Sequence, residues 1–394
     1  MKKLKIAEVD YQAIDADTHV VEPADLWTSR LPDAMASRAP RVRWNDAHET
    51  EMWYLGDEPI FPGWLSGHCG WREYAPKGPR TKEEVDPAAY DARSRLKRMD
   101  EYGIHAQVLY PNIALFNSAR IMNESDREFQ NLLIRIYNDW QVEWTSESND
   151  RLLPMAVLPF WDLEATLAEV ARCRDLGMRG IVFSQNPAAF GLPSIVSRHW
   201  DPLWTLLQDA QMPLNFHIGS GDFTSTLFTD DTDIGLHAMY ANSSVGIFQA
   251  NARTISTLIM GGVCHRFPNL NFVSVESGVG YIPFLLEAMD WQFKNSGVDK
   301  EHPEFDLLPS EYFKRQIYAC FWFERSALLH AVEQLGTGNF LFETDFPHPT
   351  SQTPGPASHA LPPHMYAHEA LGSLPSQDVE NLLHGNAARI YRLA

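Results

Sequence analysis

The stretch Ala13-Ile14-Asp15-Ala16-Asp17-Thr18-His19-Val20 predicts a buried strand that ends on two metal-ligand side chains. Asp17 and His19 are two residues apart, so on a strand their side chains project to the same face. Both could therefore reach one metal ion at the strand end. An Asp-x-His pair also occurs by chance, and Asp17 could instead cap the following turn, so the pair gains weight only from the rest of the chain.

Metal-ligand side chains recur at or just beyond the ends of three later predicted strands. They are His217, Glu276, Asp345 and His348, beside the predicted strands 213–218, 271–275 and 339–343. Singly, each has a structural explanation: a hydrogen-bonded core histidine, an ion pair or a tight turn. Together with the first pair they supply three carboxylates and three imidazoles at four strand ends. This set predicts a site for one or two divalent metal ions.

Short apolar runs alternate with longer helical patterns along the whole chain, which is typical of βα units and a parallel sheet. The predicted strands are 13–20, 105–110, 153–159, 179–183, 213–218, 271–275, 316–321 and 339–343. The predicted helices are 91–102, 124–146, 163–176, one opening at Asp201-Pro202 with a cap, one over about 235–261, and 378–391. Eight strands with intervening helices predict an α/β fold, the (β/α)8 or TIM barrel. Such a barrel carries its catalytic groups at the carboxyl ends of the strands.

A barrel of this kind can run to 394 residues as one domain. We therefore expect a single domain over residues 1–394. Residues 21–90 are expected to form an irregular N-terminal insertion after the first strand, rich in Pro, Trp and Gly. Because a loop of this length is usually functional, we expect it to act as an active-site lid. A C-terminal helix within 378–394 closes the chain.

Composition excludes several classes of protein. The net charge of −19 argues against a nucleic-acid partner, and no apolar run approaches the ~20 residues of a membrane span. The basic start is followed by Glu8 and Asp10 before any apolar region, so no signal peptide is evident. The four cysteines are scattered without a close pair, as in proteins of a reducing compartment. We expect a cytoplasmic enzyme.

The sequence resembles the amidohydrolase-2 branch of the amidohydrolase superfamily, which includes aminocarboxymuconate-semialdehyde and resorcylate-type decarboxylases. The motifs that carry the resemblance are residues 14–20, 95–104, 215–217, 266–270, 344–348 and 385–389. It implies that the strand-one pair Asp17 and His19, the strand-five His217 and the strand-eight Asp345 hold a divalent ion.

The chain departs from that family pattern at one place. The family's decarboxylases and hydrolases use a His after strand six, where this chain has Glu276 in Val275-Glu276-Ser277-Gly278. Glu276 adds an anionic ligand beside His348, and carboxylates with imidazoles suit iron or manganese better than thiophilic ions. The set is similar to that of the dinuclear amidohydrolase-related oxygenases, which activate O2 at a non-haem Fe/Fe or Fe/Mn pair. On this resemblance, Glu276 and His348 hold or help bridge to a second ion.

Our preferred hypothesis is a dinuclear monooxygenase that uses O2 to hydroxylate a small organic or amino acid. The alternative is a mononuclear Zn or Mn hydrolase or decarboxylase (carboxy-lyase) of a small carboxylic acid, with Glu276 as general base. The candidate catalytic residues are Glu276, His348 and His217. A third hypothesis, a structural subunit supporting a catalytic paralogue, is disfavoured by the complete ligand set. From the family we expect a homo-oligomer, or a hetero-oligomer with a related subunit.

Overall fold

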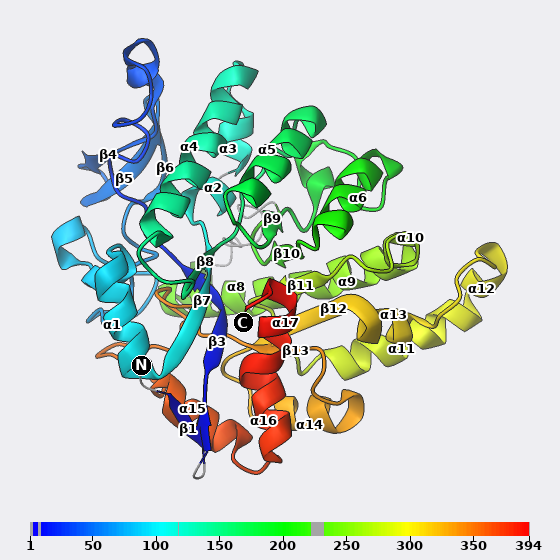
Figure 1. Ribbon diagram of the computed structural model, residues 1–394. Helices are drawn as coiled ribbons and strands as arrows, with labels where there is room; N and C mark the ends of the chain where they lie inside the picture. The colour runs from blue at the N-terminus through cyan, green and yellow to red at the C-terminus, as the bar shows by residue number, and fades with distance from the viewer. Residues whose placement is uncertain (1–2, 7–8, 117, 222–231, 394) are drawn as a thin grey trace.

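The barrel predicted from the sequence is present in the computed structural model, which describes residues 3–6, 9–116, 118–221 and 232–393 (Figure 1). Its eight strands are β3 (Ala13–His19), β7 (Ile104–Tyr110), β8 (Leu152–Pro154), β9 (Ile181–Phe183), β10 (Leu214–His217), β11 (Phe272–Val275), β12 (Ile317–Phe321) and β13 (Phe340–Phe342). β3, β7 and β8 form one parallel sheet, and β9 to β13 form a second. Single parallel bridges, Ala156 to Ile181 and Thr18 to Phe346, join the two sheets at both edges and close the barrel.

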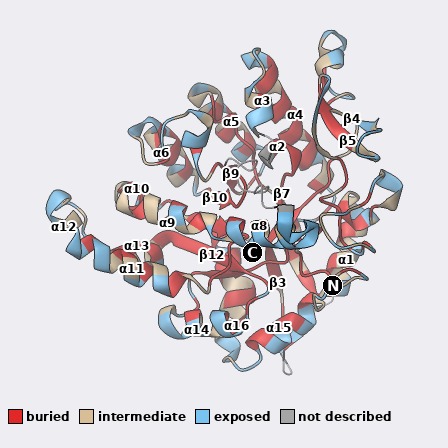
Figure 2. Cartoon of the chain, turned by 180° about the vertical axis from the view of Figure 1, so that it is seen from behind, coloured by how far each residue is buried: buried red, intermediate tan, exposed pale blue. Residues whose placement is uncertain are grey.

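Helices in the connections cover the outside of the barrel, with buried faces toward the strands and exposed faces outward (Figures 1 and 2). They are α1 (Ala92–Tyr102), α2 (Ile113–Phe116), α3 (Ser118–Met122), α4 (Arg127–Thr145), α5 (Leu163–Asp175), α6 (Asp201–Ala210), α8 (Leu236–Phe248), α9 (Ala250–Met260), α10 (Val263–Arg266), α11 (Ile282–Asn295), α12 (Val298–Glu301), α13 (Pro309–Gln316), α14 (Ser326–Leu335), α15 (Pro363–Leu371), α16 (Ser376–Glu380) and α17 (Asn386–Tyr391).

Local sequence signals explain several helix ends. Asp91 caps α1 by accepting a hydrogen bond from the Ser94 N–H at 2.8 Å, and Gly103 ends the helix with a φ of 77°. The cap predicted at Asp201 is wrong, because its side chain makes no cap hydrogen bond and instead accepts one from Arg266.

Two predicted helices are interrupted. The helix expected over 235–261 is divided into α8 and α9 at Gln249. The C-terminal helix contains a π-helical turn, Asn381–Gly385, between α16 and α17. Hydrophobic periodicity persists across such local changes in winding, so it does not reveal them.

Residues 21–90 are more ordered than the sequence predicted. They contain the antiparallel sheet β4 (Arg41–Asn45), β5 (Thr50–Leu55) and β6 (Glu58–Pro62). The two prolines of β6 are tolerated because β6 is an edge strand, so its free side needs no donors. A second small sheet, β1 (Leu4–Ile6) with β2 (Val9–Tyr11), precedes the barrel.

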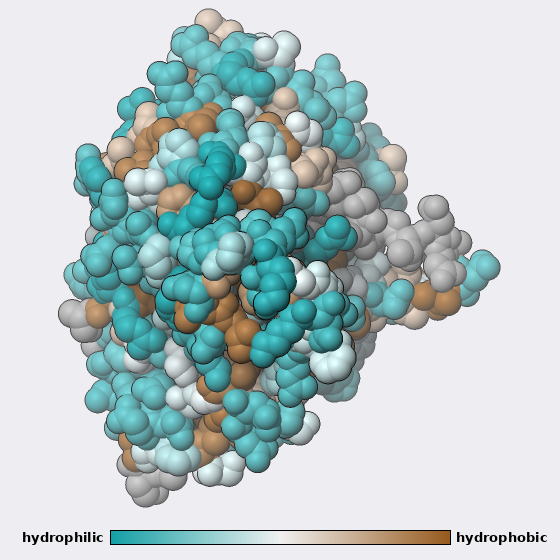
Figure 3. Space-filling model, turned by 90° about the vertical axis from the view of Figure 1, so that its right-hand side faces the viewer, coloured by the Kyte–Doolittle hydropathy of each residue, from teal (hydrophilic) through white to brown (hydrophobic). Residues whose placement is uncertain are grey.

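Most large apolar side chains lie inside the molecule, whereas the face drawn in Figure 3 is mainly hydrophilic, with hydrophobic surface in narrow strips. Phe284 and Trp291 of α11 are exceptions, at 77% and 67% exposed. In the described part of the chain, no helix combines the length and apolar character needed to cross a membrane.

Candidate metal centre

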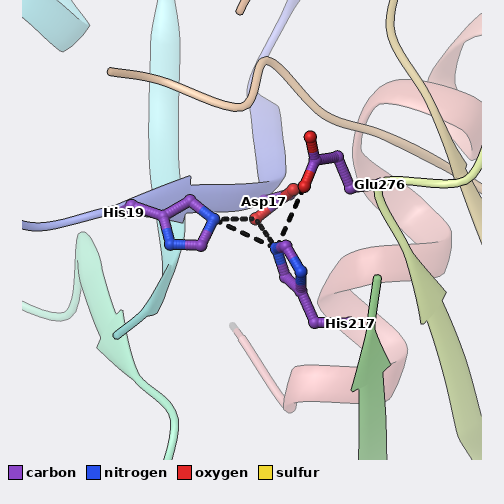
Figure 4. Close-up of side chains that lie close together, drawn as sticks. All are labelled: Asp17, His19, His217 and Glu276. Atoms are coloured by element: carbon purple, nitrogen blue, oxygen red, sulfur yellow. Dashed lines mark hydrogen bonds and ion pairs between the residues drawn. The ribbon is translucent and has the colours of Figure 1, made fainter. Parts of the chain in front are cut away.

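Four of the six predicted ligands converge at the carboxyl ends of the strands (Figure 4). Asp17 and His19 come from β3, His217 ends β10, and Glu276 directly follows β11. The Asp17 Oδ1 atom lies 3.5 Å from Nε2 of both His19 and His217, and these two Nε2 atoms are 3.0 Å apart. Glu276 Oε2 lies 3.5 Å from His217 Nε2.

Asp345 and His348 complete a second, overlapping group. His348 Nδ1 is 2.8 Å from Asp345 Oδ1, which lies 3.7 Å from His19 Nε2. The His348 ring stacks on that of His19 with centroids 3.8 Å apart. The two groups, Asp17 with His19, His217 and Glu276, and His19 with Glu276, Asp345 and His348, each keep one ligand atom per residue within 4.8 Å of the others. The structure therefore brings all six predicted residues together.

The orientation of these side chains fits a cation. His19 Nδ1 lies 3.3 Å from the Pro111 carbonyl and His217 Nδ1 lies 2.7 Å from the Ile218 carbonyl. Because carbonyls only accept, each Nδ1 carries the proton and each Nε2 presents a lone pair to the cluster. Both carboxylate oxygens of Asp17 are buried and have no hydrogen-bond donor among the described residues. Buried anionic oxygens facing imidazole lone pairs are the donors that a divalent ion requires.

Glu276 and Asp345 both adopt the left-handed backbone conformation, with φ of 57° and 56°. This region is unfavourable for residues with a Cβ and is found at functional sites where surrounding contacts impose it. At both residues the backbone N–H group makes a hydrogen bond that holds this conformation. The Glu276 N–H donates to Glu343 Oε2 at 3.2 Å, and the Asp345 N–H donates to the Asp17 carbonyl at 2.9 Å.

Burial dominates the electrostatics of the cluster. It raises the pKa of Glu276, Glu343 and Asp345 well above the usual range, and neighbouring carboxylates raise it further. Burial lowers the pKa of His19, and it lowers that of His348 to about 3. For His217, burial also lowers the pKa, but the carboxylates of Asp17 and Glu276 and the Ile218 carbonyl together outweigh it and leave the pKa raised.

Several residues that support the site were not predicted from the sequence. Asp15 accepts hydrogen bonds from the Thr344 N–H at 2.8 Å and hydroxyl at 2.6 Å, which ties β3 to the segment carrying Asp345. Burial raises the pKa of Asp15 to about 7. Asp15 lies two residues before the predicted ligand Asp17, as Glu343 does before Asp345. Strand alternation could therefore have pointed to both.

Other supporting contacts carry no sequence signal. Asn112 Oδ1 accepts a hydrogen bond from His348 Nε2 at 2.7 Å. The buried Arg95 donates through Nη2 to the His19 carbonyl at 2.6 Å. In each of these pairs the two residues are far apart in the sequence, so only the fold brings them together.

A cavity of about 150 Å³, called the inner cavity below, opens onto the cluster at Glu276 and His348. Its other walls include Phe61 and Leu65, from the stretch between β3 and α1, and Tyr240 of α8. A wider hollow of about 780 Å³, the outer groove, shares Tyr240 with it and extends past the aromatic pair that follows β12, Trp322 and Phe323.

A family model described as amidohydrolase matches residues 14–393. The chain belongs to the amidohydrolase family. It is 26% identical over 262 residues to gamma-resorcylate decarboxylase of Polaromonas sp. JS666, covering 64% of this chain and 76% of that protein.

Solved structures share the fold of this amidohydrolase. One is an amidohydrolase from Mycobacterium avium subsp. paratuberculosis K-10, with a TM-score of 0.73 and 20% identity, covering 97% of this chain and 100% of that one. Another is the dihydroxybenzoic acid decarboxylase of Polaromonas sp. JS666 with bound manganese and the inhibitor 2-nitroresorcinol, with a TM-score of 0.62 and 19% identity, covering 97% of both chains.

Proposed function

We propose that this amidohydrolase is a divalent-metal-dependent carboxy-lyase that releases CO2 from a small carboxylic acid. This reverses the order of the two enzymatic hypotheses drawn from the sequence, because the functionally named relatives reported above are decarboxylases rather than oxygenases. The observation that carries the proposal is the position of Glu276. It belongs to the ligand cluster and also lines the inner cavity, so its carboxyl group can touch a substrate held there.

In this proposal Asp17, His19, His217 and Asp345 hold the ion, with manganese favoured by the relative that contains it. A bound divalent ion supplies positive charge that offsets the buried carboxylates and orients an anionic oxygen of the substrate. This assignment leaves Glu276 available for proton transfer.

In place of the general-base role expected from the sequence, the proposal gives Glu276 the role of proton donor. The bond between the substrate carbon and its carboxyl carbon breaks, CO2 leaves, and the electron pair remains on the substrate carbon. That carbon then takes the proton from the Glu276 carboxyl, which lines the inner cavity beside the ligand cluster. Glu276 regains its proton from water after the product leaves. The apolar walls of the inner cavity limit water access during the step.

The test measures metal content and CO2 release on one preparation of the protein, purified from cells grown with manganese, zinc and iron. We expect about one ion per chain, and CO2 release from at least one acid in a panel of hydroxybenzoates. An Asp17→Asn variant, which weakens the ligand set, is the control and should lose both metal and turnover. Full metal loading without CO2 release from any acid of the panel would contradict the proposal.

The dinuclear hydroxylase remains the second candidate, and the two overlapping ligand groups favour it. The two groups contain six residues in total and share His19 and Glu276, so they could hold two ions side by side. Two iron-containing ions per chain, with O2 consumed in the presence of an organic or amino acid, would support this candidate instead.

A further inference from the structure

The inner cavity has an uncharged wall opposite the ligand cluster. Beyond Glu276 and His348, its described lining consists of apolar or neutral side chains and includes no Lys or Arg. Three apolar contributors, Phe61, Leu65 and Pro76, come from the stretch between β3 and α1. Three others are Ile218, which follows β10, and Ile247 and Phe248 of α8.

The size of this cavity corresponds to one ring. Its volume is about 150 Å³, and an apolar cavity of roughly that volume accepts a benzene molecule. A single six-membered ring can therefore fill it, with a carboxylate on the ring directed at the ligand cluster.

A second negative charge on the ring would meet no positively charged partner in the described part of this wall. Burying an unpaired carboxylate in apolar surroundings is costly, since its lost hydration is not replaced. Asp17, Glu276, Glu343 and Asp345 already place buried acidic groups on the cluster side. Arg325 lines the outer groove but is absent from the described lining of the inner cavity, and it is paired with Glu369 at 2.8 Å.

Helix α8 separates the inner cavity from the outer groove. Tyr240, Ser244 and Phe248 are spaced by four residues, so they share one helix face. All three line both the inner cavity and the outer groove, whereas their neighbour Val245 lines the outer groove alone.

We propose that the inner cavity is a subsite for the uncharged ring of a monocarboxylic acid, and that the α8 face around Ser244 excludes ring substituents that carry a second charge. The proposal rests on the proposed function, because it places the reacting carboxylate at the ligand cluster. Tyr240 offers a hydroxyl group, and Ser244 Oγ, which donates to the Tyr240 carbonyl at 3.0 Å, can still accept, so the subsite takes neutral hydrogen-bonding substituents such as a ring hydroxyl. Aromatic dicarboxylic acids are rejected.

The test compares two acids of similar shape, 3-methylbenzoate and benzene-1,3-dicarboxylate, by calorimetric binding to the metal-loaded protein without turnover. We expect 3-methylbenzoate to bind more than about tenfold more tightly. Ser244→Arg should shift the preference toward the dicarboxylate by about tenfold or more, because the new guanidinium pairs with the second carboxylate. Val245→Arg is the matched control, adds the same charge outside the inner cavity, and should leave the preference unchanged.

Equal binding of the two acids by the wild-type protein would overturn the subsite while leaving the carboxy-lyase proposal intact. An equal shift in Ser244→Arg and Val245→Arg would also overturn the assignment of α8, since bulk charge would then explain it. If Ser244→Arg fails to fold by circular dichroism, Ser244→Lys replaces it. Failure of both acids to bind would overturn the subsite, whereas the proposed function is overturned only if the hydroxybenzoate panel also gives no CO2.

Discussion

Replacing Glu276 by Gln is the sharpest perturbation of this site, because it removes a titratable proton and changes little else. The amide has nearly the size of the carboxyl group, and the backbone bond from residue 276 to Glu343 does not depend on the side chain. A positioned acid contributes roughly 10²–10⁴-fold to a proton-transfer step. We expect kcat to fall by this factor, about 3–5 kcal/mol in barrier height. KM should change little, because the cavity wall is retained.

The assay measures CO2 release and metal content on the same preparation of Glu276→Gln. In the mononuclear proposal, the ion stays bound because the four residues proposed to hold it, Asp17, His19, His217 and Asp345, are unchanged. Glu324→Gln is the matched control. Glu324 is a buried carboxyl that accepts the Val279 and Gly280 N–H groups but is absent from the described cavity lining, and Gln can still accept there. Wild-type kcat in Glu276→Gln would refute the proton role, and loss of a second ion would support the dinuclear candidate.

Three further predictions concern the supports of the site. Glu22 Oε1 accepts a hydrogen bond from the Asn112 N–H at 2.8 Å, and burial raises the pKa of this carboxyl from 4.5 to about 7. Its contribution to stability is therefore complete below about pH 4.5 and is lost as pH rises through 7. In Glu22→Gln, about 2–3 kcal/mol of the stability loss between pH 5 and 8 should disappear in denaturant unfolding. Arg95→Met leaves the His19 carbonyl without its 2.6 Å donor and should cost about 1–3 kcal/mol in the same assay. Asn112→Leu removes the 2.7 Å partner of His348, whose Nδ1 lies 2.8 Å from the proposed ligand Asp345, and should weaken metal affinity about 10-fold in metal titration because Asp345 is then less well oriented.

Each of these three has an outcome that contradicts it. An identical pH dependence in wild type and Glu22→Gln would show that this carboxyl does not carry the proton. If Arg95→Met has the stability of the wild type, water must replace the guanidinium as the hydrogen-bond donor to the His19 carbonyl. Unchanged metal affinity in Asn112→Leu would show that the hydrogen bond to His348 does not influence metal binding.

The barrel could be predicted from the sequence because each βα unit carries its own local signals. The helix bounded by Asp91 and Gly103 has a cap at its start and a glycine at its end, both visible in the sequence and both used in the structure. The sheet β4 to β6 was not predicted, since its prolines and turns mask the alternation that marks a strand. Its strands are stabilised by tertiary contacts such as the packing of Trp53 on Trp27, with ring centroids 5.4 Å apart.

The convergence of the six candidate ligand residues could be predicted for a related reason. A parallel barrel brings all carboxyl strand ends to one face, so residues at such ends meet whatever their separation in sequence. The supports could not be found in this way, because Arg95 reaches His19 from α1 and Asn112 reaches His348 from the segment after β7. Their roles depend on side-chain reach across the fold rather than on position at a strand end.

The arrangement of acidic groups implies that a metal bound at this cluster would contribute to folding as well as to the proposed chemistry. Asp17, Glu276, Glu343 and Asp345 are buried within one region, and neither oxygen of Asp17 meets a hydrogen-bond donor in the described structure. Such a group of carboxylates opposes folding unless positive charge or protons offset it. A divalent ion that binds only the folded chain supplies that charge, and the stability it adds rises with the logarithm of its concentration over its Kd. The strained backbone at Glu276 and Asp345 is therefore best understood together with the ion, since the same contacts that impose the conformation also bring the ligand atoms together.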